Sequence, residues 1–115
     1  MLNISLRIFT AGSYWLYVDL HRRIQTICQK LFPTYRFVTF TLPTWETGRE
    51  GLLIASLDPY MDLKNPSNAR MRELNAMNLL FYNRQVHRAA FAIPQFILET
   101  LQEQSECQQQ RGLEL

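Results

Sequence analysis

The sequence predicts a small α/β unit of about three strands with flanking helices, whose last strand is antiparallel and central. Residues 2–9 (LNISLRIF) and 35–42 (YRFVTFTL) are rich in β-branched and aromatic types, as strands are. Residues 51–57 (GLLIASL) form an unbroken apolar run, which is typical of a strand buried on both faces. The connection before that run has only about eight residues, which favours an antiparallel return.

A helix is predicted between the first two strands. After a break at Ala11-Gly12, Ser13 is the expected N-cap, and Pro33 ends the helix. His21 and the Arg22-Arg23 pair are expected on its solvated side. Apolar residues recur mostly in steps of three and four, the spacing of one helix stripe; they are Leu16, Leu20, Ile24, Ile27, Cys28 and Leu31.

The C-terminal half is predicted to be helical. Residues 69–80 are expected to form a helix with Met71, Leu74 and Met77 facing inward, and Pro94 fits the first turn of a last helix. Residues 1–101 are therefore expected to form one domain, followed by a polar, flexible tail over 102–115.

Composition limits the functional classes. The 115 residues carry a net charge of +2 and contain no apolar run of about 18 residues, so neither a nucleic-acid partner nor a membrane partner is expected. Cys28 lies at an apolar helical position and Cys107 in the polar tail, which is not a disulfide framework. A reducing, cytoplasmic location is expected.

Few residues carry recognisable chemistry. No two glycines form a G-x-G, and His21 and His87 are far apart in sequence, so neither a phosphate loop nor a metal site is predicted. His87-Arg88 admits two interpretations: an acid–base and anion-binding pair, or structural residues that bond buried backbone and carboxylate partners. Trp45 follows a strand at the sheet edge where ligands of open α/β sheets bind; it could equally be a loop aromatic that covers the core.

Four segments, taken together, resemble one family. Tyr82-Asn83-x-x-x-His87-Arg88-Ala89-Ala90-Phe91-x-x-Pro94 is similar to the YN-x-x-x-HRAAF-x-x-P signature of spermidine synthases. The other matches lie in the expected order: Trp15-Leu16-x-x-Asp19-Leu20 resembles WLHLDL, residues 28–33 resemble CQSLFP, and residues 42–45 resemble IPTY. The matches span about residues 7–101.

The resemblance implies an aminopropyltransferase of polyamine synthesis, built on a Rossmann-like, methyltransferase-type domain. Members transfer an aminopropyl group from decarboxylated S-adenosylmethionine, their co-substrate, to a diamine such as putrescine. It also implies that this chain begins just before the family's fifth strand, and that its three strands are ordered 2–9, 51–57, 35–42. The chain would then be the C-terminal portion of the domain.

Most of the family's machinery has no counterpart here. The GGGDG loop and the DSSDP-type catalytic loop are missing from the sequence, and Asp58-Pro59 follows the last strand, out of order for the catalytic loop. No catalytic residue, metal ligand or bound cofactor is therefore expected in this chain. The one transferable site position is Trp45, which stands where the family's IPTY has its amine-contacting tyrosine and is expected to bind substrate. His87 and Arg88 are then expected to be structural.

Two functions remain open. The chain is either the C-terminal part of a spermidine-synthase-like enzyme, inactive alone, or a non-catalytic module that docks on a full-length synthase or a complementary piece. The second idea rests on the expected open edge of strand 2–9, which invites self-association or pairing with a missing N-terminal part. A nucleic-acid module is a distant third.

Overall fold

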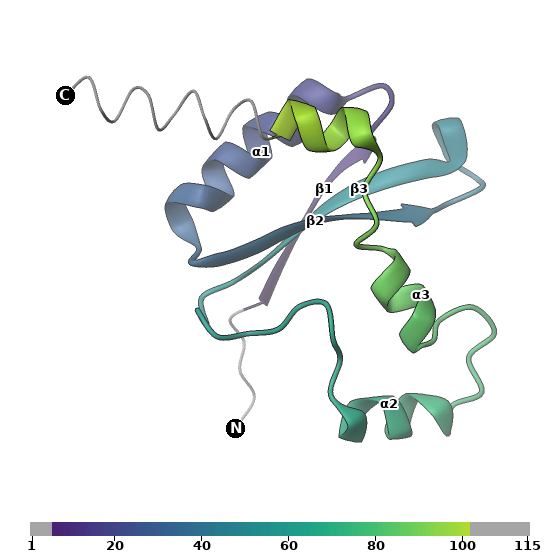
Figure 1. Cartoon of the computed structure of the whole chain (residues 1–115). Helices are drawn as coiled ribbons and strands as arrows, with labels where there is room; N and C mark the ends of the chain where they lie inside the picture. Colours follow the sequence, from purple (N-terminus) through teal and green to yellow (C-terminus); the bar gives the residue numbers. More distant parts are fainter. Residues whose placement is uncertain (1–5, 102–115) are drawn as a thin grey trace.

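The computed structural model describes residues 6–101. Its elements, in chain order, are β1 (Leu6–Ser13), α1 (Val18–Leu31), β2 (Thr34–Thr41), the 3-10 turn η1 (Glu46–Gly48), β3 (Arg49–Ser56), α2 (Asn68–Asn75) and α3 (Arg84–Ala89). A further helix covers residues 95–101, directly after Pro94. The α/β class predicted from the sequence is confirmed (Figure 1). The expected tail over 102–115 and Cys107 lie outside the described residues.

The sheet has the order β1-β3-β2, and β3 is antiparallel to both neighbours. The last strand is therefore central, as its continuous apolar sequence predicts. β1 and β2 run in the same direction, as a strand–helix–strand crossover requires. The break expected at Ala11-Gly12 is wrong: β1 continues to Ser13, because an irregularity in the pairing between Thr10 and Ser13 accommodates Gly12 at a φ of 78°.

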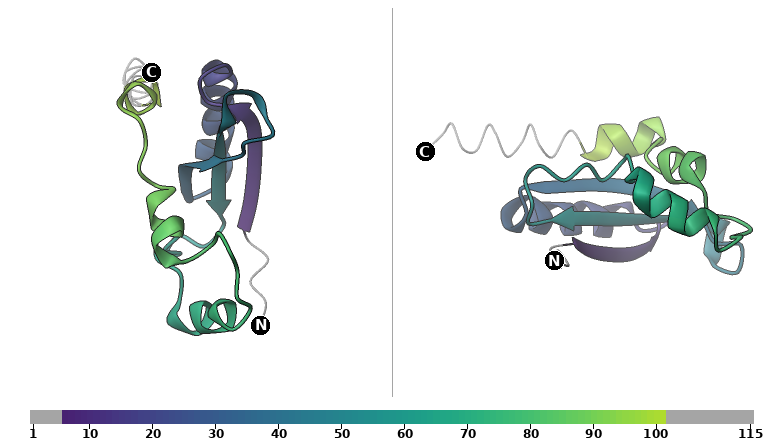
Figure 2. Two further views of the ribbon diagram at one scale, coloured as in Figure 1. Left: turned by 90° about the vertical axis from the view of Figure 1, so that its right-hand side faces the viewer. Right: turned by 90° about the horizontal axis from the view of Figure 1, so that it is seen from below.

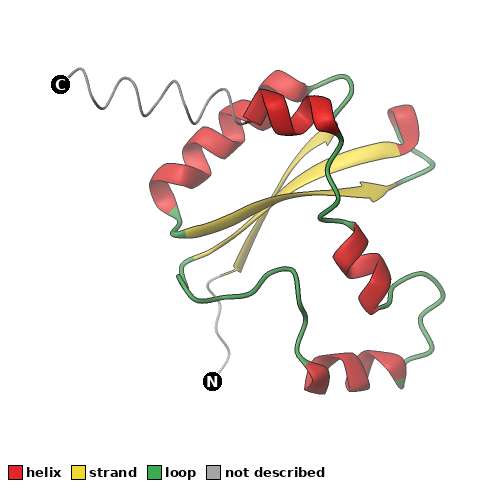
Figure 3. Ribbon diagram, in the orientation of Figure 1, coloured by secondary structure: helices red, strands yellow, loops and turns green. Residues whose placement is uncertain are grey.

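One face of the sheet is covered by two helices. Leu53, Ala55 and Phe37 of the sheet pack with Cys28 of α1 and Ile97 of the last helix in a single buried cluster. The last helix lies beside the start of α1, where the rings of Phe96 and Trp15 stand 4.6 Å apart between centroids (Figure 3). This packing forms the core of the described chain.

The other face and the β1 edge are much less covered. Side chains alternate along a strand, so Ile54 and its cross-strand partner Ile8 lie opposite the helices, and Ile8 is 59% exposed. Within residues 6–101, no strand pairs with the outer edge of β1 (Figure 2). Across the same residues, no helix is both long and apolar enough to cross a lipid bilayer.

The sheet-facing side of α1 matches the predicted stripe only in part. Cys28 is buried and Ile24 packs against the core, as predicted. The other buried residues of the helix are His21 and Gln25, whereas Ile27 and Leu31 of the expected stripe are 52% and 61% exposed. The turn before the helix fixes which side of α1 faces the sheet. The Tyr17 N–H donates to the Ser13 carbonyl at 3.0 Å, and Ser13 caps this turn rather than α1, because its Oγ accepts from the Trp15 N–H.

His21, expected on a solvated surface, is instead a core residue only 1% exposed. Its Nε2 lies 2.9 Å from the Gly12 carbonyl, to which it donates, and its ring meets Phe37 edge-on at 5.4 Å. Gly51 makes room for this packing: a Cβ there would stand 2.9 Å from His21 Cε1 and 2.7 Å from Phe37 Cζ. Desolvation by burial lowers the pKa of His21, and the Gly12 hydrogen bond opposes this only in part.

The helical region after β3 is capped by its own side chains. Ser67 and Asn83 accept from backbone N–H groups in the first turns of α2 and α3. Met71 of α2 is buried as predicted, but α2 ends at Asn75 and Met77 is 64% exposed. α3, within the HRAAF-like segment, was not predicted.

His87 joins two loops that are distant in sequence. Its Nε2 donates to the Leu63 carbonyl at 2.9 Å, so its Nδ1 accepts from the Tyr82 hydroxyl at 2.8 Å. The nearby Phe91 ring stacks under the Arg36 guanidinium at 5.1 Å from its centroid. The expected backbone partner of His87 is thus confirmed. The expected buried carboxylate partner of Arg88 is wrong, because Arg88 is exposed and forms no ion pair within residues 6–101.

We predict that burial of His21 makes stability fall in mild acid. The pKa of His21 is lowered in the folded state from its ordinary value of 6.5, so the unfolded chain binds more protons in the interval between the two values. The free energy of unfolding should have its full value above about pH 6.5. It should decrease below that pH and become constant again below the folded-state pKa of His21. Urea unfolding across pH 5 to 8 measures this. His21→Gln, which retains a donor for Gly12, should flatten the curve; an unchanged curve contradicts the assignment.

Replacement of His87 tests its structural role. His87→Ala leaves the Leu63 carbonyl and the Tyr82 hydroxyl without their partner, and we expect a loss of about 1–3 kcal/mol in the free energy of unfolding. Gln85→Ala, an exposed change in the same helix, is the matched control and should stay within about 0.5 kcal/mol. Equal stability of the two variants would refute a structural His87.

Candidate functional site

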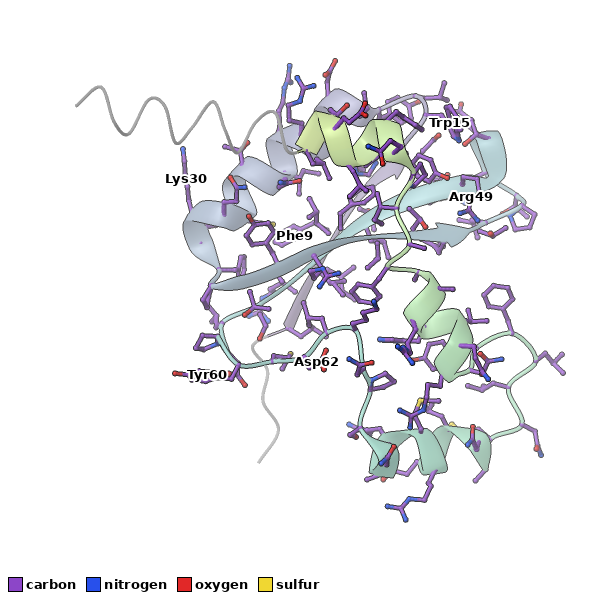
Figure 4. The ribbon with its side chains drawn as sticks, in the orientation of Figure 1. Phe9, Trp15, Lys30, Arg49, Tyr60 and Asp62 are labelled. Carbon is purple, nitrogen blue, oxygen red and sulfur yellow. The ribbon has the colours of Figure 1, made fainter. Side chains whose placement is uncertain are left out.

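A cavity opens where the end of β1 meets the turn between β2 and β3. It consists of two adjoining hollows of ≈ 410 Å³ and ≈ 170 Å³ that share Gly12, Trp45 and Glu50. We call them together the Trp45 site. Ser13, Tyr17, Thr44 and Glu46 line the larger hollow, and Thr10, Phe40, Leu42, Gly51 and Leu52 line the smaller. Arg49, labelled in Figure 4, marks this end of the sheet.

Local hydrogen bonds hold the turn that carries Trp45. Its N–H donates to the Leu42 carbonyl, and its own carbonyl accepts from the Gly48 N–H, each at 3.1 Å. Thr47 and Gly48 both have positive φ, 60° and 68°, which closes the turn within few residues. The Thr47 and Ser13 hydroxyls lie 2.7 Å apart in a hydrogen bond that ties the turn to β1. Trp45 is therefore held at the cavity by a turn that follows β2 and is hydrogen-bonded to β1.

Trp45 is 62% exposed and lines both hollows. An indole so placed offers a broad apolar face that also attracts cations. The predicted substrate-binding residue thus lies beside a cavity at a sheet edge, and its contact with a substrate remains a prediction.

Acidic groups surround the Trp45 site. The Tyr17 hydroxyl donates to Glu46 Oε2 at 3.1 Å. This hydrogen bond raises the pKa of the exposed Tyr17 phenol above its ordinary value, with smaller contributions from the charge of Glu46, from desolvation and, last, from the charge of Glu50. Tyr17 therefore reports a negative local potential to which both carboxylates contribute.

Glu50 is a site residue that the sequence reasoning missed. It is the first residue of β3 with a buried side chain, only 3% exposed, and it belongs to both hollows. The available signal was a carboxylate directly before the apolar run of residues 51–57. A charge at the entrance of a doubly buried strand needs a partner or a function.

Other candidate residues lie elsewhere. His87 and Arg88 belong to α3 and do not line the Trp45 site. Asp58 follows β3 at the opposite end of the sheet, near Tyr60 in Figure 4, where its carboxylate accepts from the Tyr60 N–H at 2.9 Å. The sequence-based rejection of Asp58 as the catalytic base stays a prediction.

No metal cluster is found among the described residues, and the hollow between α2 and α3 is not acidic. Among residues 6–101, no three His, Cys, Asp or Glu side chains gather where they could hold a metal ion. A hollow of ≈ 530 Å³ separates α2 from α3, but it is lined by Arg72, Arg84 and several amides rather than carboxylates. Of these two regions, the Trp45 site is the one suited to a cationic ligand.

Comparison with known proteins finds similar proteins whose names concern polyamines. None of the family models compared matches the chain. The chain is 36% identical over 92 residues to the spermine synthase of Arabidopsis thaliana, covering 76% of this chain and 26% of that protein. It is 33% identical over 93 residues to putrescine N-methyltransferase 2 of Nicotiana attenuata, covering 75% of this chain and 25% of that protein.

The structure agrees with the sequence comparison. The spermidine synthase of Thermotoga maritima superposes with a TM-score of 0.70 at 24% identity, over 84% of this chain and 33% of that one. A spermidine synthase in complex with the transition state analogue AdoDATO gives a TM-score of 0.67 over the same shares. These superpositions confirm the predicted methyltransferase-type fold. The chain spans about a quarter of the length of the curated relatives cited above, and it is similar in sequence and in fold to the spermidine and spermine synthases.

Proposed function

We propose that this chain is the C-terminal segment of a spermidine-synthase-like aminopropyltransferase and that the Trp45 site receives its diamine substrate. The observation that carries the proposal is the position of Trp45. The residue that matches the amine-contacting position of the family motif lines an acidic cavity at a sheet edge. The names of two relatives, a spermine synthase and a putrescine N-methyltransferase, both concern amines.

The proposed reaction joins the diamine to an aminopropyl group. The neutral amine nitrogen attacks the carbon next to the sulfonium of decarboxylated S-adenosylmethionine and forms the new C–N bond. The C–S bond breaks, its electron pair stays on sulfur as a thioether, and a carboxylate accepts the proton from nitrogen. Trp45 would hold the methylenes of the diamine, while acidic side chains would hold its charge.

We propose that the chain does not complete this reaction alone. Its 115 residues contain neither a GGGDG-type loop for the nucleoside nor a DSSDP-type loop for the base. Residues 1–101 would act as part of a larger domain. A cytoplasmic location fits Cys28, a buried free thiol.

A turnover assay tests this proposal. The purified chain, given decarboxylated S-adenosylmethionine and putrescine, should form no spermidine above the level of a heat-denatured sample, because it lacks the two loops. Mass spectrometry of the product mixture measures the outcome. An authentic spermidine synthase under the same conditions is the positive control. Spermidine formation by the pure chain would contradict the proposed inactivity.

A second function, a docking module without its own catalysis, is favoured by a specific observation. The outer edge of β1 has no strand partner within residues 6–101, and Ile8 and Ile27 are more than half exposed. An unpaired strand edge next to exposed apolar side chains is suited to pairing with another chain. The partner would be a full-length synthase, a complementary N-terminal piece or a second copy.

Association measurements test the docking function. Size-exclusion chromatography with light scattering should show self-association, or a complex when a full-length synthase is added. Ile8→Lys should weaken either form, because a charge on an edge strand opposes pairing. Tyr60→Lys, at a loop residue 92% exposed, is the matched control. A monomer that binds no synthase would exclude docking.

A further inference from the structure

We propose that Glu50 binds a primary ammonium group of a linear aliphatic diamine in the Trp45 site, and so selects for a cationic substrate. This inference rests on the proposed function and deepens it. It assigns the recognition of charge to one carboxylate, at a position that the family motif did not predict.

The first argument is that the Glu50 carboxylate has no protein partner within residues 6–101. The residue is 3% exposed, yet within residues 6–101 it forms no ion pair and no side-chain hydrogen bond. A carboxylate in a sheltered position attracts a cation more strongly than one in bulk water, because the surrounding dielectric is lower. Glu50 lines both hollows of the cavity, so a ligand in the cavity can supply the missing partner.

The nearest cation in sequence cannot neutralise Glu50. Arg49 precedes it on β3, and successive side chains of a strand point to opposite faces. The Arg49 guanidinium donates to the Tyr14 hydroxyl at 3.1 Å and to the Thr41 hydroxyl at 2.8 Å. Arg49 is therefore not the partner of the Glu50 carboxylate.

The shape of the Trp45 site selects the class of cation. Gly12, at a φ of 78°, leaves space beside the carboxylate: a Cβ there would come within 3.7 Å of Glu50 Oε2 and 3.1 Å of the Tyr17 ring. Trp45, Phe40 and Leu52 supply apolar walls. A carboxylate beside aromatic and aliphatic surface matches an ammonium attached to a methylene chain.

The inference has a consequence for stability. Within residues 6–101 the Glu50 carboxylate makes no hydrogen bond or ion pair that its charge would strengthen, so removal of the charge should not lower the stability of the free protein. Glu50→Gln keeps the shape of the side chain and removes its charge. The variant should therefore have a Tm at least equal to that of the parent chain, while losing affinity for the diamine.

The experiment is a titration of the full ¹⁵N-labelled chain with putrescine, followed by NMR. Putrescine should shift the Trp45 indole signal and the amide signals of Gly12 and Gly51, and should raise the Tm of the parent chain. Butane-1,4-diol, of equal length but uncharged, should do neither. Glu50→Gln should weaken putrescine binding at least tenfold, whereas Glu99→Gln, an exposed glutamate on the last helix, should leave it unchanged.

The outcomes separate this inference from the proposed function. If Trp45→Ala abolishes binding but Glu50→Gln does not, the diamine site stands and the role of Glu50 is overturned. If putrescine produces no shift in the parent chain, both proposals are overturned. Should Glu50→Gln fail to fold, nuclear Overhauser contacts in the parent chain decide: a contact between the putrescine methylene next to nitrogen and the Glu50 Hγ supports the inference, and its absence overturns it.

Discussion

The structure depends on the pairing of β3 with both of its neighbours. Residues Arg49–Ser56 pair with β2 along their whole length, and Glu50 and residues 52–56 pair with β1, both antiparallel. Backbone groups paired on both sides can be buried without loss of hydrogen bonds. Leu53 and Ala55 then meet α1 and the last helix on one face. Because β3 holds β1 and β2 in register, it also brings the end of β1 to the turn that carries Trp45.

The same constraint accounts for the geometry of the candidate site. At the start of β3 the buried strand meets the exposed turn, and Glu50 occupies that boundary. Gly51, the next residue, admits Phe37 and His21 on the opposite face, and His21 donates to Gly12 on β1. Gly12 in turn leaves the space beside Glu50. The core packing and the cavity are therefore linked through two glycines, and a side chain at either position would disturb both.

Several elements could be predicted because their signals are local. Pro94 precedes the last helix, and the β-branched and apolar runs mark three strands within a few residues of their observed bounds. The rotation of α1 could not be predicted in this way. Apolar spacing pointed to Ile27 and Leu31, but the helix turns His21, which bonds to Gly12, toward the sheet instead. Among the site residues, Trp45 was recognised from its motif, whereas Glu50 carried no motif and became visible only through its burial.

The sequence by itself determined the resemblance to spermidine synthases, the order of the three strands with a helix between the first two, and the central position of the last strand, because each follows from short-range pattern or from motifs in a fixed order. Tertiary structure decided which face of α1 is buried. It also decided that His21 and His87 hydrogen-bond to backbone carbonyls of other segments, and that Glu50 lies beside Trp45 without a protein partner in the described part of the chain. These features depend on contacts between segments far apart in the chain, such as His87 with Leu63. Spacing along the chain describes one element at a time, and it does not specify which side chains of different elements meet.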